Sequence, residues 1–256
     1  LIAVEYLKDK YQALGISPAQ ANGDYFQNVP LKVIKTPKVN ILIDGANFIY
    51  YDDFIAVSSG ETTTIEVDEF TFAGYGIKST LYNDYENLDV SGKLVVAIKG
   101  EPKDEDGKYL VTGSKDRSKW SNGRQSLSSK RNIAKELCAK AFILIDQAMF
   151  KRYSSYYKAV EERGGESTLA LDVDSKSYYG FLGGKKLGDQ LIQSSNGTFK
   201  KDIKITFNNS SEPITSKNVV AILPGTEKPD EYIILSAHLD HIGMHDGEVF
   251  NGADDD

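Results

Sequence analysis

The sequence predicts an α/β protein in which a mixed sheet is interrupted by a β-rich insertion. Apolar residues recur at helical spacing over residues 1–14, which indicates an opening helix. Short β-branched runs separated by glycine, asparagine and aspartate fill residues 39–100, as expected for strands joined by turns. Two apolar strands at 218–223 and 233–236 are joined by a charged turn, which is typical of an antiparallel hairpin at the edge of a mixed sheet.

The opening helix is amphipathic. Its apolar positions are Leu1, Val4, Leu7, Tyr11 and Leu14. Gly15 follows directly and favours the end of the helix, because glycine adopts the left-handed backbone conformation without a steric penalty. The apolar runs of the chain are shorter than the roughly 18 residues that a membrane-spanning helix needs, so we expect no transmembrane segment.

The middle of the chain is expected to be rich in strands. The clearest of these are residues 40–43, 62–67 and 94–98, where β-branched and apolar residues gather in short runs. Two glycines lie within residues 72–77. We expect them to permit tight turns or a close approach of two backbone segments, because a glycine has no side chain to obstruct either.

A polar stretch at residues 101–129 indicates a long loop. Within it, Trp120 is expected to pack on its own domain rather than to cover a substrate. Ser129 is placed to cap a helix that runs to about residue 140, because serine often satisfies the first backbone N–H groups of a helix. A buried strand is expected next, at 141–145, and a short helix at 186–193.

Charge and cysteine content narrow the possible functions. The net charge is −7 and the pI is near 5.1, which argues against nucleic-acid binding, because that function needs a basic face. Cys138 is the single cysteine, so the chain can form no internal disulfide. It falls in the helix expected after Ser129, and we expect its side chain to be buried.

All three histidines of the chain, His238, His241 and His245, lie within eight residues just after the strand expected at 233–236. Residues i and i+2 of an extended strand point to the same face, so Asp240 is placed to accept a hydrogen bond from the imidazole of His238. Imidazole nitrogen and carboxylate oxygen are ligands that zinc binds at short distances. His241 points to the other face, and we interpret both it and His245 as structural residues.

A carboxylate returns 17 positions after His238, as Asp255 or a neighbouring aspartate, on a loop that contains Gly247 and Gly252. A carboxylate has two oxygens and can bridge two metal ions. The pattern therefore predicts a metal site made by His238 and the aspartate run, with Asp240 orienting the histidine.

The segments AHLDH at 237–241 and NGADDD at 251–256 together resemble the zinc aminopeptidases of metallopeptidase family 28. The resemblance implies that His238 binds zinc, that Asp240 orients His238, and that Asp255 bridges two zinc ions. It also implies an aminopeptidase that acts on peptides with a free N-terminus and is secreted or periplasmic. Residues 1–31 are similar to the start of that family's catalytic domain, which implies an edge strand at residues 25–31 after the first helix. The general base and the other ligands of the family are expected beyond residue 256, so we expect the 256-residue chain by itself to be inactive.

A second resemblance lies in the middle of the chain. Residues 72–77 (FAGYGI), 82–85 (YNDY) and 90–96 (VSGKLVV) resemble the protease-associated domain, a small β-rich module inserted in several members of that family. The implied organisation is a first part of a mixed-sheet zinc-peptidase domain at 1–38, an inserted protease-associated domain at 39–205, and the resumed peptidase domain at 206–256.

Two other functions stay open. Some proteins with this pair of domains have lost their metals and serve as binding or receptor ectodomains, so a non-catalytic role is one alternative. A metallo-β-lactamase-like hydrolase is the other, because its H-x-H-x-D-H motif matches residues 236–241 except at Ser236. Serine is a poor zinc ligand beside imidazole, and the aspartate run fits the aminopeptidase pattern instead.

Overall fold

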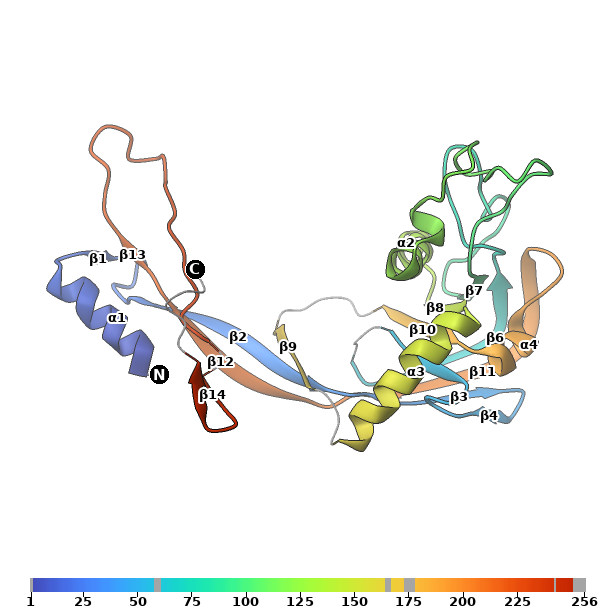
Figure 1. Cartoon of the computed structure of the whole chain (residues 1–256), viewed down its shortest axis with the longest axis horizontal. Coiled ribbons are helices and arrows are strands. Elements are labelled where there is room, and N and C mark those ends of the chain that lie inside the picture. The colour runs from blue at the N-terminus through green and yellow to red at the C-terminus, as the bar shows by residue number, and fades with distance from the viewer. Residues whose placement is uncertain (1, 58–60, 164–166, 173–177, 242, 251–256) are drawn as a thin grey trace. The chain divides into compact units, whose positions relative to one another are not determined.

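The structure is a computed structural model that describes residues 2–57, 61–163, 167–172, 178–241 and 243–250 (Figure 1). The chain divides into two compact units, one formed by Leu1–Lys32 with Pro213–Asp256 and the other by Val33–Glu212. The predicted α/β class with a mixed sheet is confirmed, because the second unit holds an eight-stranded mixed sheet with helices packed on it. The identification of residues 39–205 as a protease-associated domain stays a prediction.

The sheet of the second unit has four parallel strands at its centre. In sheet order its strands are β4 (Ala46–Phe48), β3 (Lys38–Ile43), β11 (Gly197–Asn208), β6 (Thr63–Phe72), β7 (Leu94–Ile98), β8 (Ala141–Ile145), β10 (Tyr179–Gly183) and β5 (Phe54–Ala56). The strands β6, β7, β8 and β10 run parallel, and the outer neighbours pair antiparallel. The strands expected at 40–43, 62–67, 94–98 and 141–145 are therefore confirmed, whereas β10 was not predicted.

Two helices, α2 (Gly123–Glu136) and α3 (Gln147–Glu162), pack on one face of this sheet. The helix α2 connects β7 to β8 and α3 connects β8 to β10, because parallel neighbours need a crossover that returns to the same end of the sheet. Ala134 of α2 and Phe150 of α3 are buried in one apolar layer with Phe142 of β8. The two helices thus cover a buried part of the sheet.

The other face of the sheet encloses the larger apolar core. Side chains of β3, β7 and β11 are buried there with Leu187 and Leu191 of the short helix α4 (Lys185–Leu191), which confirms the helix expected at 186–193. The rings of Tyr179 in β10 and Phe207 in β11 lie 5.1 Å apart, although three strands separate β10 from β11 in the sheet. The sheet therefore curls around this core, and a bulge in β11 contributes to the bend.

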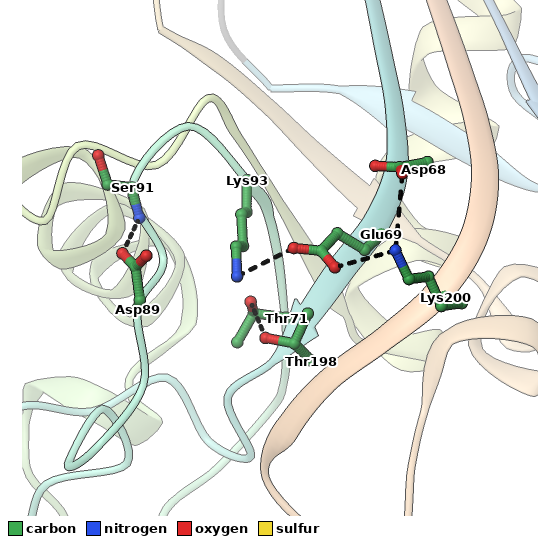
Figure 2. Close-up of polar contacts among 8 residues, drawn as sticks. All are labelled: Asp68, Glu69, Thr71, Asp89, Ser91, Lys93, Thr198 and Lys200. Atoms are coloured by element: carbon green, nitrogen blue, oxygen red, sulfur yellow. Dashed lines mark hydrogen bonds and ion pairs between the residues drawn. The ribbon is translucent and has the colours of Figure 1, made fainter.

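Charged and hydroxyl side chains join β6 to β11 and to the residue before β7 (Figure 2). Glu69 of β6 lies 3.0 Å from Nζ of Lys93 and 3.7 Å from Nζ of Lys200. The hydroxyls of Thr71 and Thr198 lie 3.2 Å apart across the same two strands. Exposed ion pairs stabilise a fold by only ~0.2–1 kcal/mol each, so this network favours the register of β11 on β6 and adds little to stability.

The first unit begins with α1 (Ile2–Ala13), which confirms the expected opening helix, and Gly15 follows it with a φ of +70°. The strands β1 (Ser17–Pro18) and β13 (Ala221–Ile222) pair antiparallel. The hairpin of β14 (Gly243–His245) and β15 (Glu248–Phe250) also lies in this unit. A separate three-stranded sheet has the order β12 (Ser211–Val219), β2 (Phe26–Lys35) and β9 (Ser167–Leu171), of which β9 falls within the residue range of the second unit. None of the helices in the described part of the chain is long and apolar enough to cross a membrane.

Two strand predictions for the first unit need correction. Residues 233–236 form no strand, and Ile233 is 95% exposed, so the predicted hairpin with 218–223 is wrong. A strand forms only where a neighbouring strand satisfies its backbone groups, and no described residue pairs with this segment. The strand expected at 25–31 is present as β2, but it lies between two neighbours rather than at a sheet edge.

Three details of the second unit also differ from the prediction. The helix α2 begins at Gly123 rather than Ser129 and ends at Glu136 rather than near 140. Cys138 follows it in the left-handed conformation, with a φ of +61°, and its side chain is exposed rather than buried. The long helix α3 was not predicted at all. In contrast, Trp120 is only 4% exposed, which confirms that it packs on its own domain.

Candidate metal centre

The predicted metal residues lie in an extended, solvent-exposed part of the first unit. Residues 223–241 contain no helix or strand, and β14 begins at Gly243. The side chain of His238 is 50% exposed and that of Asp240 is fully exposed. Side chains in this position are accessible to a metal ion, but the surrounding structure does little to fix their rotamers.

The imidazole of His238 contacts the backbone of Asp240 more closely than its carboxylate. Nδ1 of His238 lies 2.6 Å from the Asp240 carbonyl oxygen and 4.0 Å from Oδ1 of the same residue. A carbonyl oxygen only accepts hydrogen bonds, so this contact favours the tautomer with the proton on Nδ1 and the basic lone pair on Nε2. The predicted role of the Asp240 carboxylate in orienting His238 stays a prediction.

A tight hairpin follows the histidine motif and returns the chain toward it. Asp246 and Gly247 form its two-residue turn with φ values of +51° and +84°, and Gly243 pairs with Phe250. Asp-Gly favours this turn because both positions need a left-handed backbone. This stretch was predicted as a loop, although the Asp-Gly pair between Met244 and Val249 is a signal for a hairpin.

The hairpin also holds the second histidine of the motif. Nδ1 of His241 lies 3.2 Å from the carbonyl oxygen of Phe250 in β15. This contact gives His241 a structural role in joining the extended segment to the hairpin, which agrees with its interpretation from the sequence. Asp255 lies outside the described residues, and its role as a metal ligand stays a prediction. In the part of the chain that the structure describes, no three histidine, cysteine or acidic side chains gather around a possible metal position.

The second unit contains a buried ammonium group that the sequence analysis missed. Lys130 of α2 is fully buried, and its Nζ donates hydrogen bonds of 2.9 and 2.8 Å to the carbonyl oxygens of Ile98 and Gly100. Burial lowers the pKa of Lys130 to about 8. Its position in a polar helical stretch gave no signal, because such a lysine is usually exposed. The contacts with two carbonyls at the end of β7 indicate a structural role.

The loop after β6 contains two glycines, Gly74 and Gly76, at positions where a side chain would collide with its neighbours. Gly76 has a φ of +66°, and a Cβ atom there would lie 2.8 Å from Cβ of Ala97. At Gly74 a Cβ atom would lie 2.7 Å from Oδ1 of Asp84. Asp84 is a buried carboxylate, and burial raises its pKa although it accepts a hydrogen bond from the backbone N–H of Ile77. The expected close approach of the backbone at these glycines is confirmed.

A comparison with known protein families finds a match at the end of the chain. Residues 218–256 match the model of peptidase family M28. No curated protein matches the chain. A solved aminopeptidase from Aneurinibacillus sp. strain AM-1 is similar at 16% identity and a TM-score of 0.34, over 88% of this chain and 43% of that one. The peptidase M28 precursor from Shewanella amazonensis SB2B is similar at 15% identity and a TM-score of 0.34, over 93% and 48%. The chain thus spans less than half the length of either protein, and the family match covers the residues that carry the predicted metal ligands.

Proposed function

We propose that this chain belongs to a zinc-dependent aminopeptidase, which removes N-terminal residues from peptides. The observation that carries the proposal is the match of residues 218–256 to peptidase family M28, because His238, Asp240 and Asp255 all lie inside it. The motif and the family match are thus found in the same short segment. In this proposal the general base and the remaining ligands come from residues outside 1–256, and the substrate is a peptide with a free N-terminus.

The described donors fit zinc by their chemistry. The contact between Nδ1 of His238 and the Asp240 carbonyl leaves the basic lone pair on Nε2, which is the form of imidazole that binds a metal. Carboxylate oxygen is the second ligand type that zinc accepts, and Asp255 would supply it. When bound, two zinc ions polarise the scissile carbonyl and activate a water molecule.

The residues of this chain would mainly bind and orient. His238 and Asp255 would hold the metal, and Asp240 would accept a hydrogen bond from Nδ1, the ring nitrogen of His238 that does not bind the metal. The carbonyl of Asp240 fixes the tautomer of the ring, and its carboxylate, 4.0 Å from Nδ1, could replace the carbonyl as the acceptor after a small rotation. A carboxylate in that position raises the basicity of the imidazole more than a carbonyl does.

The family match favours the peptidase over the other hydrolase considered. A metallo-β-lactamase-like site would need a histidine where this chain has Ser236, and a serine hydroxyl is a weak zinc ligand. The aspartate run that the aminopeptidase pattern requires is present within residues 251–256. A secreted or periplasmic location, which the resemblance implies, is part of the same proposal.

The first test compares two histidine variants in the protein expressed from its complete gene. Zinc content is measured by mass spectrometry after dialysis, and activity is measured with aminoacyl p-nitroanilides. We expect His238→Ala to lose zinc and activity, and the matched control His241→Ala to keep both, because His241 is not a predicted ligand and joins the extended segment to the hairpin through Phe250. Wild-type zinc content in His238→Ala would refute its role as a ligand.

Two further arms sharpen this test. Asp240→Asn keeps the backbone carbonyl and loses only the carboxylate, so we expect it to bind zinc about 10–100-fold more weakly if the carboxylate orients His238. The 256-residue chain by itself is expected to be inactive. Activity in that chain, abolished by His238→Ala, would contradict the statement that the general base lies outside these residues.

A further inference from the structure

A cavity of about 480 Å³ opens in the second unit, in the groove between α2 and α3 and beside the edge strand β5. Its volume is in the range of pockets that bind small ligands and short peptide segments. The lining residues are Ile34, Lys35, Thr36, Pro37, Tyr50, Tyr51, Ile55, Ala56, Val57, Arg124, Leu127, Ser128, Arg131, Tyr153, Tyr157 and Thr168. This set contains several tyrosines and three basic residues, but no carboxylate.

The aromatic part of the cavity is neutral. Tyr50 and Tyr51 lie with their rings 4.1 Å apart, and the rings of Tyr153 and Tyr157 on α3 lie 6.4 Å apart. Burial raises the pKa of Tyr50 and Tyr51, so their phenols stay protonated near neutral pH. The tyrosines therefore offer ring faces for stacking, and their hydroxyls carry no negative charge that would repel an anion.

The positive charge of the cavity comes from one face of α2. Arg124 and Arg131 are seven residues apart, which places them two helical turns, or about 10 Å, apart along the axis. Nε of Arg124 donates a 2.7 Å hydrogen bond to the hydroxyl of Tyr153, and Nη1 of Arg131 donates a 3.3 Å bond to the carbonyl of Val57. Each bond uses one of the five N–H donors of a guanidinium.

Neither arginine forms an ion pair with any residue that the structure describes. The third basic residue, Lys35, differs, because its Nζ lies 2.6 Å from a carboxylate oxygen of Glu212. In a protein with a net charge of −7, two arginines without an acidic partner create a local positive field. That field would attract an anionic ligand.

The packing around Arg131 shows that the position of this arginine is built into the fold. A Cβ atom at Gly180 of β10 would lie 2.7 Å from Cδ of Arg131 and 3.3 Å from a methyl group of Val57. Glycine at this position therefore makes room for the arginine stem between the helix and the sheet. The guanidinium is held in place at one wall of the cavity by this packing and by the Val57 carbonyl.

We propose that this cavity binds an extended acidic peptide segment, whose carboxylates pair with Arg124 and Arg131 while its apolar side chains stack on the tyrosines. In the extended polyproline II conformation a peptide rises about 3.1 Å per residue and completes a turn every three residues, so acidic residues three apart lie on one side, about 9 Å from each other, close to the spacing of the two arginines. Guanidinium recognises carboxylate through paired hydrogen bonds. The proposal does not depend on the zinc site, because the cavity lies wholly within the second unit.

The test is fluorescence anisotropy with a labelled eight-residue peptide in which every third residue is glutamate and the others are leucine and serine, compared with one in which glutamine replaces glutamate. We expect the intact chain to bind the acidic peptide and to lose affinity as salt is added. Arg124→Gln should weaken binding about tenfold, because each arginine supplies a charge-assisted hydrogen bond. The control is Arg152→Gln, which changes an exposed arginine of α3 outside the cavity and should bind like the wild type.

Further variants separate lost contacts from lost structure. Arg131→Gln should also weaken binding about tenfold, and circular dichroism shows whether the variant stays folded. Tyr157→Leu should weaken binding more than Tyr156→Leu, because only Tyr157 lines the cavity. Equal binding of the two peptides, or unchanged affinity in Arg124→Gln, would overturn the proposal. Binding of a phosphorylated peptide, with no binding of the glutamate peptide, would also overturn it and assign the cavity to phosphate.

Discussion

Replacing Lys130 by methionine tests whether a buried ammonium group opposes folding at neutral pH. Lys130 is fully buried, and burial lowers its pKa from 10.5 to about 8. Because the folded state releases this proton at a lower pH than the unfolded chain does, the unfolded chain binds more protons between these two values. Stability therefore rises with pH through this range in the wild type, and this contribution is absent in Lys130→Met.

The size of the effect follows from the two pKa values. One pKa unit corresponds to ~1.4 kcal/mol, so the full gain above pH 10.5 is about 3 kcal/mol. Between pH 7 and pH 9 the folded amine loses most of its proton while the unfolded amine keeps it, and the gain is about 1.4 kcal/mol. The upper limit of pH 9 avoids the tyrosines, whose ordinary pKa is about 10.

The stability of Lys130→Met at pH 7 alone would be hard to interpret. The variant leaves the carbonyls of Ile98 and Gly100 without their donor, at a cost of ~1–3 kcal/mol each, since both lie beside a buried side chain. It also removes the penalty of about 3 kcal/mol for burying the charge. These contributions have opposite signs and similar size, so the pH dependence is the informative quantity.

The assay is urea unfolding at pH 7 and pH 9, followed by the fluorescence of Trp120. This residue is the only tryptophan and is buried in the same unit, so its signal reports the unfolding of that unit. The control is Lys135→Met, which changes an exposed lysine of α2 and should keep the wild-type pH dependence. If the wild type and Lys130→Met gain equal stability from pH 7 to pH 9, the lowered pKa of Lys130 is refuted.

Two further predictions concern backbone positions with positive φ. Gly76→Ala should destabilise the second unit by about 2–4 kcal/mol, because it adds a clash with Ala97 to the strain of a left-handed backbone. Gly107 has a similar φ but open space around it, so Gly107→Ala is expected to lower the free energy of unfolding by only about 1 kcal/mol. Urea unfolding measures both variants, and equal losses of stability would show that the clash at Gly76 is absent. Cys138 follows α2 with its side chain exposed, so Ellman's reagent should modify one thiol per chain without denaturant. Modification only after unfolding would contradict that exposure.

The strands of the second unit were predictable because their apolar character is local. β7 and β8 are runs of consecutive apolar residues that the sheet buries on both faces, and such runs stand out in any sequence. β10 was missed because Gly180 and Gly183 resemble turn residues. Both positions need glycine because a larger residue would collide with Arg131 at position 180 and with Ile145 at position 183. Only the tertiary structure shows this requirement.

The helices α2 and α3 were harder to predict than the strands of this unit. The buried positions of α2 are Ser126, Lys130 and Ala134, so its inward face carries too few large apolar residues to mark its start. In α3 the face toward the cavity is formed by Tyr153 and Tyr157, and no helix was predicted there. The arginine and tyrosine cavity depends on both helices. It could not be predicted while one was misplaced and the other was not recognised.

The candidate metal centre differs from the cavity, because its residues could be identified from the sequence but their geometry could not. His238 and Asp240 were chosen on the assumption that a strand at 233–236 continues through them and points both to one face. In the structure none of the described strands pairs with residues 233–236, and Nδ1 of His238 lies nearer to the Asp240 carbonyl than to the Asp240 carboxylate. The i, i+2 rule applies to a regular strand, and residues 233–241 form none, so the motif identifies the donors but does not position them. The comparison of Asp240→Asn with wild type is therefore decisive for this residue: unchanged zinc affinity would mean that the carbonyl contact is the functional one, and weakened affinity would mean that the carboxylate takes its place when zinc binds.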